Sequence, residues 1–274
     1  MVAAEVLVAA GAELAEGPVW DPVHGRLLWV DILQGHVHAT TPDGEDRIVY
    51  QAGTTIGCIA HRGGDEWIVA ERDRLTLVTG WTTREELVRL PIDGDVRTND
   101  GKLDPRGRMV VGTMAFDAEP DRGQLFSWDG ASLQTLVEPV TISNGLDWTP
   151  DGRTMLYIDT PTQEIGAYDY DLDTGSMTNR RVVATIAADD GAPDGMCLGP
   201  DGAIWVALWG GRCIRRIALD GTVLGQIDVD AANVSCCVSA GRDLYITTAR
   251  TDSPEEPGDG AIFRLTPAAT KEHS

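Results

Sequence analysis

Oxygen-bearing side chains recur at one place in a repeated segment of this chain. The place lies eight residues before a turn glycine, or nine where the turn is longer, and is held by Glu16, Thr55, Asn99, Asn144, Asp194 and Asn233. If the repeated segments fold alike, these side chains occupy equivalent points of one structure. Equivalent points around a common axis form a ring of carboxylate, amide and hydroxyl oxygens at the mouth of a channel.

Two members of this ring, Glu16 and Asp194, are carboxylates that repel each other in a narrow channel and are costly to bury. A bound cation removes both penalties. Glu16, Asp194 and the amide of Asn144 supply oxygen ligands without a nearby His or Cys, which suits a hard divalent ion. We therefore predict one divalent metal ion, Ca²⁺ first, with Mg²⁺, Mn²⁺, Zn²⁺ or Fe²⁺ as alternatives. The competing interpretation is that these residues cap strand ends and hold ordered water.

The segments that carry these residues repeat six times. Their turn glycines are spaced 39, 43, 45, 50 and 39 residues apart, at Gly25, Gly64, Gly107, Gly152, Gly202 and Gly241. A β-rich run follows each glycine, such as Met155–Ile158, and a further strand-like run follows that one. Copies of about 40–50 residues with three or four short strands each are typical of a six-bladed β-propeller. A generic all-β chain with chance turn spacing is the alternative.

A strand-like run, Glu5–Val8, stands before the first repeat. A propeller must close its ring, and this run can do so by pairing with the last repeat, after Ala261–Leu265. We therefore predict an all-β, six-bladed β-propeller whose ring is closed by the N-terminal strand. In this prediction residues 1–267 form a single domain and 268–274 a flexible tail.

The composition argues against several classes of protein. The chain has 274 residues, 42% of them hydrophobic, and a net charge of −21, which opposes nucleic acid or an anionic membrane as a partner. No apolar run approaches the roughly 18–20 residues of a membrane span, and the N-terminus lacks the basic start of a signal peptide. Five cysteines without a CxxC pair predict reduced, mostly buried thiols. We expect a cytoplasmic monomer.

Several longer motifs lie at the repeated sites. They are Glu16-Gly-Pro-Val-Trp20, Arg97-Thr-Asn-Asp-Gly-Lys-Leu-Asp-Pro105, Gly112-Thr-Met114, Ser143-Asn-Gly-Leu-Asp-Trp148 and Pro193-Asp-Gly-Met-Cys197. Together they resemble the SMP-30/gluconolactonase/regucalcin family, and the likeness extends over nearly the whole chain. Members of that family are six-bladed propellers that hydrolyse sugar lactones with one divalent metal ion in the central channel.

The resemblance implies a role for five residues of these motifs: Glu16, Asn144 and Asp194 as metal ligands, and Arg97 and Asn99 as contacts to substrate hydroxyls or carbonyl. The implied reaction is the opening of a sugar lactone by water, with the metal polarising the ester carbonyl. Asp194 is then both a ligand and the best-placed base for the proton of that water. The planar fork of donors on Arg97 suits a carbonyl or a pair of hydroxyls.

One departure from the family concerns the rim of the channel. Where regucalcin-type members have two glutamates, the second of which contacts substrate, this chain has Phe116 and Asp117. The resemblance therefore implies Asp117 as a further substrate contact, with a side chain one methylene shorter. This departure leaves the identity of the sugar open and does not affect the metal ligands.

Two other functions fit the same residues. The first is a hydrolase of the phosphotriesterase-like kind that acts on aryl esters or other lactones. The second is a non-catalytic, calcium-binding propeller, against which Arg97 and Asn99 argue because a pure ion store needs neither. The sequence contains no Gly-x-Ser-x-Gly setting around a serine, so we expect no nucleophile triad.

Overall fold

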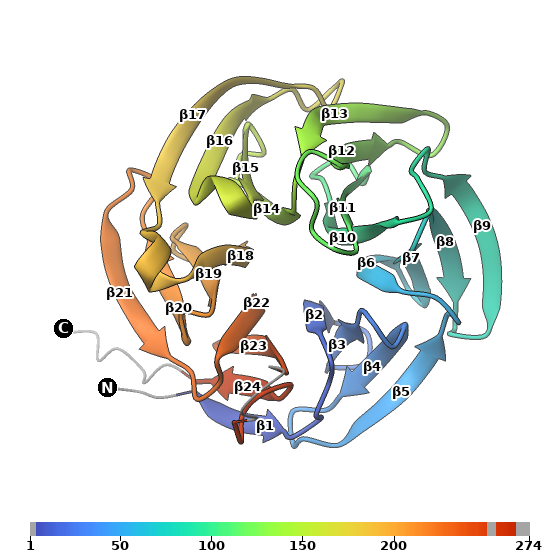
Figure 1. Ribbon diagram of the computed structural model, residues 1–274. Helices are drawn as coiled ribbons and strands as arrows, with labels where there is room; N and C mark the ends of the chain where they lie inside the picture. Colours follow the sequence, from blue (N-terminus) through green and yellow to red (C-terminus); the bar gives the residue numbers. More distant parts are fainter. Residues whose placement is uncertain (1–3, 251–255, 267–274) are drawn as a thin grey trace, which may run out of the picture.

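The computed structural model describes residues 4–250 and 256–266. The described residues form 24 β-strands and two short 3-10 helices, η1 (Thr160–Thr162) and η2 (Ala188–Asp190). Figure 1 shows the sheets side by side around a central axis, so the protein has an all-β, propeller-like fold. The predicted tail at 268–274 lies outside the described residues.

Four of the sheets each contain four consecutive antiparallel strands. The first two are built from β2 (Ala15–Asp21), β3 (Arg26–Asp31), β4 (His36–Thr40), β5 (Asp46–Gln51), and from β6 (Ile56–Gly63), β7 (Glu66–Glu71), β8 (Arg74–Thr79), β9 (Thr83–Arg89). The next two are built from β10 (Val96–Leu103), β11 (Met109–Ala115), β12 (Gly123–Trp128), β13 (Leu133–Val140), and from β14 (Ser143–Trp148), β15 (Thr154–Asp159), β16 (Glu164–Tyr170), β17 (Met177–Thr185).

The remaining strands form one eight-stranded sheet. They are β18 (Ala192–Leu198), β19 (Ile204–Trp209), β20 (Cys213–Ile217), β21 (Val223–Asp228), β22 (Asn233–Ala240), β23 (Asp243–Ala249), β24 (Ile262–Leu265) and β1 (Glu5–Val8). A single residue pair, Trp209 with Asn233, joins β19 to β22. The N-terminal strand β1 pairs antiparallel with β24, as the sequence predicts.

The turn glycines identified in the sequence adopt the conformation that their role requires. Gly25, Gly64, Gly107, Gly152, Gly202 and Gly241 all have φ between 55° and 82°. Side chains with a Cβ rarely adopt this region, whereas glycine enters it without penalty. Each glycine lies shortly before the second strand of its hairpin, at β3, β7, β11, β15, β19 or β23, which confirms the repeated hairpin prediction.

The strands nearest the axis contain a β-bulge beside their polar residue. The pairing register shifts between Glu16 and Val19, Thr98 and Gly101, Ser143 and Leu146, and Pro193 and Met196. Bulges re-aim side chains. Glycines at these bulges allow close approach, since a Cβ on Gly145 would lie only 2.6 Å from the backbone oxygen of Asp194. The inner strands of neighbouring sheets can therefore bring their polar side chains together.

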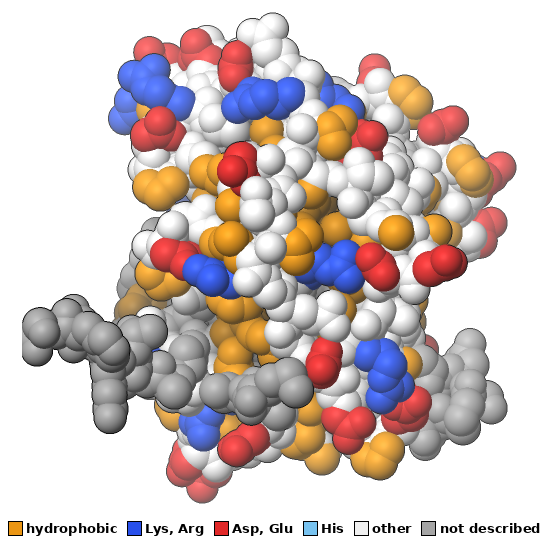
Figure 2. Space-filling view, turned by 90° about the vertical axis from the view of Figure 1, so that its left-hand side faces the viewer, with side chains coloured by type: hydrophobic (Ala, Val, Ile, Leu, Met, Phe, Trp, Pro, Cys, Tyr) orange, Lys and Arg blue, Asp and Glu red, His pale blue; other side chains and the backbone are white. Residues whose placement is uncertain are grey.

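Apolar side chains fill the space between neighbouring sheets. Leu156 and Ile158 of β15, for example, belong to one buried cluster with Val206 and Leu208 of β19. On the outer surface, Figure 2 shows acidic and basic side chains interspersed on one face, which agrees with a solvated exterior. No helix in the described part of the chain is long and apolar enough to cross a membrane.

Candidate functional site

One cavity of about 380 Å³ brings together five of the six predicted site residues. Glu16, Arg97, Asn99, Asn144 and Asp194 line it, together with Leu14, Met114, Ile142, Thr160, Ala192 and Trp209. The five predicted residues come from four inner strands, β2, β10, β14 and β18. All five are at most 6% exposed, and charged or amide side chains are seldom buried to this extent unless they are paired.

A chain of hydrogen bonds crosses this cavity from β10 to β18. Arg97 donates from Nη1 to Asn99 Oδ1 (2.7 Å), and Asn99 donates from Nδ2 to Asn144 Oδ1 (3.2 Å). Asn144 donates from Nδ2 to the Thr160 hydroxyl (2.9 Å), which itself donates to the backbone oxygen of Pro193 (2.9 Å). These bonds fix the amide of Asn144 with its oxygen on the side of Asn99. A carbonyl oxygen has two lone pairs, so Oδ1 keeps one for a further partner.

The carboxyl groups of the site have strongly perturbed pKa values. Burial, followed by repulsion from Asp100, raises the pKa of Glu16 to about 8. Burial, followed by repulsion from Glu16 and Asp100, raises the pKa of Asp194 well above its usual range. Burial raises the pKa of Asp100 itself to about 6, and lowers that of Arg97 to about 10. Perturbed groups of this kind, gathered in one cavity, are typical of functional sites.

The donors in the cavity fit a hard cation. Glu16, Asp194 and Asn144 offer carboxylate and amide oxygens, and no histidine lines the cavity. In the described part of the chain, no group of three or more His, Cys, Asp and Glu side chains is arranged as a metal site. A site here would therefore have to combine two carboxylates with the amide and with water, as oxygen-liganded ions accept.

Three residues named in the sequence analysis lie outside this cavity. Asn233 and Thr55 are buried at their equivalent places in the repeat but do not line it. Asp117 is exposed, and its carboxylate accepts a hydrogen bond from the backbone N–H of Glu119 (3.1 Å). Its proposed contact with substrate stays a prediction.

Asp100 and Thr160 are functional candidates that sequence reasoning missed. Asp100 is 9% exposed and its charge acts on both Glu16 and Asp194. The signal for it was its place beside Asn99 in the longest motif. Thr160 carried no comparable signal, because it enters the cavity from η1, outside the repeated hairpin.

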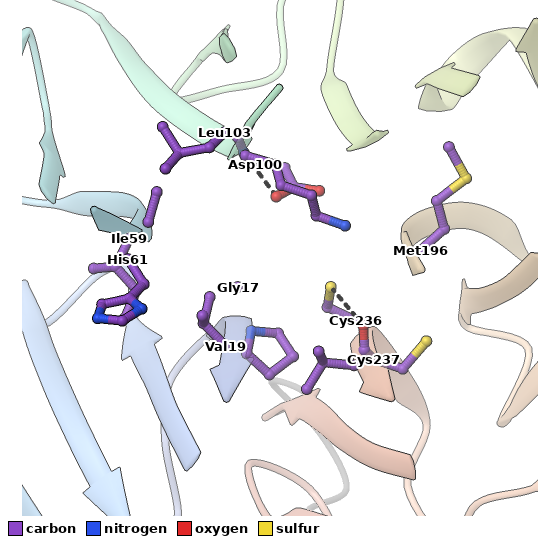
Figure 3. A pocket seen from close by; sticks show the side chains of 14 residues that line it. Gly17, Val19, Ile59, His61, Asp100, Leu103, Met196, Cys236 and Cys237 are labelled. Carbon is purple, nitrogen blue, oxygen red and sulfur yellow. Dashed lines mark hydrogen bonds between the residues drawn. The ribbon is translucent and has the colours of Figure 1, made fainter. Parts of the chain in front are cut away.

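A second cavity, of about 250 Å³, lies further along the same inner strands (Figure 3). Gly17, Asp100 and Met196 line it; Gly17 and Asp100 directly follow the site residues Glu16 and Asn99, and Met196 stands two residues after Asp194. Cys236 and Cys237 also line it, and all five cysteines of the chain are buried with free thiols, as predicted. None of the predicted site residues lines it, so we place the candidate site in the first cavity.

A propeller-like fold with carboxylates, amides and an arginine at the ends of its inner strands defines a recognisable class of protein. Residues 14–250 match the model of the SMP-30/Gluconolactonase/LRE-like region. The chain belongs to this family. It is 37% identical to the protein YvrE of Bacillus subtilis over 92% of this chain and 90% of that one.

Other relatives have names that state an activity. The chain is 34% identical to pentonolactonase XacC of Haloferax volcanii, over 96% of this chain and 94% of that one. Among solved structures, a calcium-binding protein, regucalcin, from Agrobacterium tumefaciens is similar, with a TM-score of 0.91 and 26% identity. The match covers 96% of this chain and 93% of that chain.

Proposed function

We propose that this protein is a metal-dependent hydrolase that opens the ester ring of a sugar lactone to give the aldonic acid. Glu16, Asn144 and Asp194 would hold one divalent ion, Ca²⁺ first. Arg97 and Asn99 would contact the substrate. The observation that carries the proposal is that these five residues, from four separate strands, line a single cavity. Family membership supports the sugar lactone as the substrate class.

The charge of the site supports a divalent ion. Glu16, Asp100 and Asp194 provide three carboxylates against the single guanidinium of Arg97, which leaves two negative charges when all are ionised. The nearby Lys102 is already paired with Asp147, with its Nζ 3.0 Å from Asp147 Oδ2. Buried charge of this size is unstable without a counter-ion. A divalent cation supplies the missing two positive charges.

The reaction adds one water molecule across the ester bond. When bound, the metal polarises the lactone carbonyl and offsets the negative charge that develops on its oxygen. Asp194 takes a proton from the attacking water, whose oxygen bonds to the carbonyl carbon. The bond between that carbon and the ring oxygen then breaks, and the ring oxygen receives the proton. Arg97 and Asn99 orient the lactone, and the burial of the five site residues limits access of other water.

The same proposal includes the architecture around the site. We propose that the eight-stranded sheet is two blades joined at one residue pair, and that β1 closes the ring by its pairing with β24. Contacts between inner strands support this, because β22 packs against β2 as β2 packs against β6. The result is a six-bladed propeller in a single domain over residues 1–267. We also propose a monomer that acts in the cytoplasm, in line with the charge of −21.

An aryl-ester hydrolase is the second candidate, because part of the cavity wall is apolar. Leu14, Ile142 and Trp209 offer the kind of surface on which an aromatic leaving group packs. The third candidate is an ion store, since the similar regucalcin structure from Agrobacterium tumefaciens is that of a calcium-binding protein. A pure ion store does not explain why Arg97 and Asn99 line the cavity here.

A pH-stat assay separates these functions. The rate of acid release from gluconolactone, corrected for spontaneous hydrolysis, is measured with and without a chelator, and beside it that from phenyl acetate. We expect lactone hydrolysis that is lost on chelation and restored by a divalent ion. Full activity in excess chelator refutes the role of the metal. Turnover of the aryl ester alone supports the second candidate, and no turnover of either supports the ion store.

A further inference from the structure

We infer that the rim of the cavity selects lactones whose end remote from the carbonyl carries no hydroxyl, that is, terminal-deoxy sugar lactones. This inference rests on the proposed function and deepens it. Polar groups are distributed unevenly over the depth of the cavity.

The floor and the rim of the cavity differ in chemistry. We call the floor the buried polar set Glu16, Arg97, Asn99, Asn144 and Asp194, beside which Met114 is also buried, and the rim the half-buried set Leu14, Ile142, Thr160, Ala192 and Trp209. The floor holds every charged group that lines the cavity. Four of the five rim side chains are apolar or aromatic. A ligand that fills both levels therefore meets charge and amides at one end and hydrocarbon at the other.

The single hydroxyl group of the rim already has two hydrogen-bond partners, and Arg97 of the floor already uses some of its donors. The Thr160 hydroxyl accepts from Asn144 Nδ2 and donates to the Pro193 oxygen, both at 2.9 Å. Arg97 uses Nη1 for Asn99 and the Thr98 oxygen, and Nη2 lies 3.2 Å from the sulfur of Met114. The indole N–H of Trp209 is the remaining side-chain donor of the rim, on an otherwise apolar ring.

These two levels orient a lactone in one way. Its carbonyl and the hydroxyls next to it need charge and donors, so they lie against the floor. The carbon chain at the far end then lies between Trp209, Leu14 and Ile142. A terminal methyl group packs there. A terminal hydroxyl would lose its hydrogen bonds to water and would find few hydrogen-bond partners in this wall. Hydrophobic pockets reject an added hydroxyl only modestly. Because the rim is also only half-buried, we expect a preference of about tenfold in kcat/KM for the lactone without the terminal hydroxyl.

The test compares two lactones that differ by one oxygen, D-galactono-γ-lactone and its terminal-deoxy analogue D-fucono-γ-lactone. We measure kcat/KM for both on each preparation, so that any partly unfolded fraction cancels in the ratio. The wild type should prefer the deoxy lactone about tenfold, mainly through KM, because the rim contacts a part of the substrate that does not react. Trp209→Phe should keep this preference, since it retains the apolar face without the N–H.

The substitution Trp209→Gln should remove the preference for the deoxy lactone, because the amide supplies a partner for the terminal hydroxyl. The ratio of the two kcat/KM values should then be close to one. Trp205→Gln is the control on the same strand outside the cavity, and it should leave the ratio unchanged. Hydrolysis of both lactones without preference, or a ratio that Trp209→Gln does not move, overturns the inference but not the proposed function. Failure to hydrolyse any lactone overturns both.

Discussion

Glu16 on β2 and Asp194 on β18 line the same cavity, although 178 residues separate them in the chain. The charge of Glu16 is the largest contribution, after burial, that raises the pKa of Asp194. Two carboxyl groups held in this way cannot both be ionised at low cost. Protonation and metal binding are the two ways to relieve the conflict, and most of our predictions follow from the competition between them.

Replacement of Asp194 by alanine should abolish most turnover while leaving the metal-free fold intact. Loss of a general base that is also a ligand lowers kcat by roughly 10³-fold. The thermal transition in chelator should barely move, because the lost group is a buried carboxyl that destabilises its neighbours. Kinetics and a thermal scan check both points. Glu85→Ala on the exposed strand β9 is the control. Wild-type turnover in Asp194→Ala would remove Asp194 from the mechanism.

The stability of the metal-free protein should fall as the pH rises from 4.5 to 8. The pKa of Glu16 is about 8 in the folded protein against an ordinary value of 4.5, so between these values the folded state binds more protons than the unfolded state. The free energy of unfolding therefore decreases with pH across this window. Bound metal should reverse the trend, because its affinity grows as the ligands lose protons.

Thermal scans in chelator and in excess Ca²⁺ from pH 5 to pH 8 provide the measurement. The difference in Tm between the two conditions should widen with pH. Glu16→Gln should reduce the slope of the metal-free series, since it removes one of the titrating carboxyl groups and leaves Asp100 and Asp194. A constant difference across the series contradicts this interpretation of the site.

Asn99→Leu should weaken divalent-ion binding even in the absence of substrate. Asn99 donates to Asn144 Oδ1 (3.2 Å) and to the Ser143 backbone oxygen (2.8 Å), so it orients the amide that would bind the ion. Loss of such an orienting group typically costs about 10–100-fold in metal affinity. Calorimetric titration with Ca²⁺ measures it. Asn233→Leu, at the equivalent place of another repeat, should bind as the wild type does, and equal loss in both variants would point to a general structural effect.

Gly145→Ala should destabilise the protein and impair the site together. A Cβ at this position would lie 2.6 Å from the Asp194 backbone oxygen and 2.8 Å from Met196 Cγ, so β14 and β18 must separate. Overpacking of this kind lowers Tm by roughly 5 °C in a chain of this size. Gly94→Ala is the control, since a Cβ at Gly94 meets no atom within 4 Å. An unchanged Tm and kcat/KM in Gly145→Ala would show that this close approach is not required.

The repeat was readable in the sequence because each copy has the same two local signals. A turn glycine such as Gly152 must have positive φ, and a polar residue such as Asn144 stands at a fixed distance before it. Local signals repeated in register locate strands and the ends that face the axis. They do not report which polar residues share one cavity, and Thr55 and Asn233 carry the signal without lining it.

Other features of the site depend on tertiary contacts. Thr160 reaches the cavity from a 3-10 turn outside the repeated hairpin, whereas Trp209 lies at the end of a hairpin strand, β19, where its side chain gave no signal of a binding site. The influence of Asp100 on Glu16 depends on burial, which a single sequence does not show. Asp117 illustrates the reverse case, in which the resemblance implies a contact but the side chain lies exposed in the loop after β11.

The most direct test of the central claim is the position of a metal ion in crystals grown with Mn²⁺. We predict one anomalous difference peak in the cavity, about 2–2.6 Å from oxygens of Glu16, Asn144 and Asp194. A peak elsewhere, or full occupancy by water in protein that hydrolyses lactones under the same conditions, would contradict it.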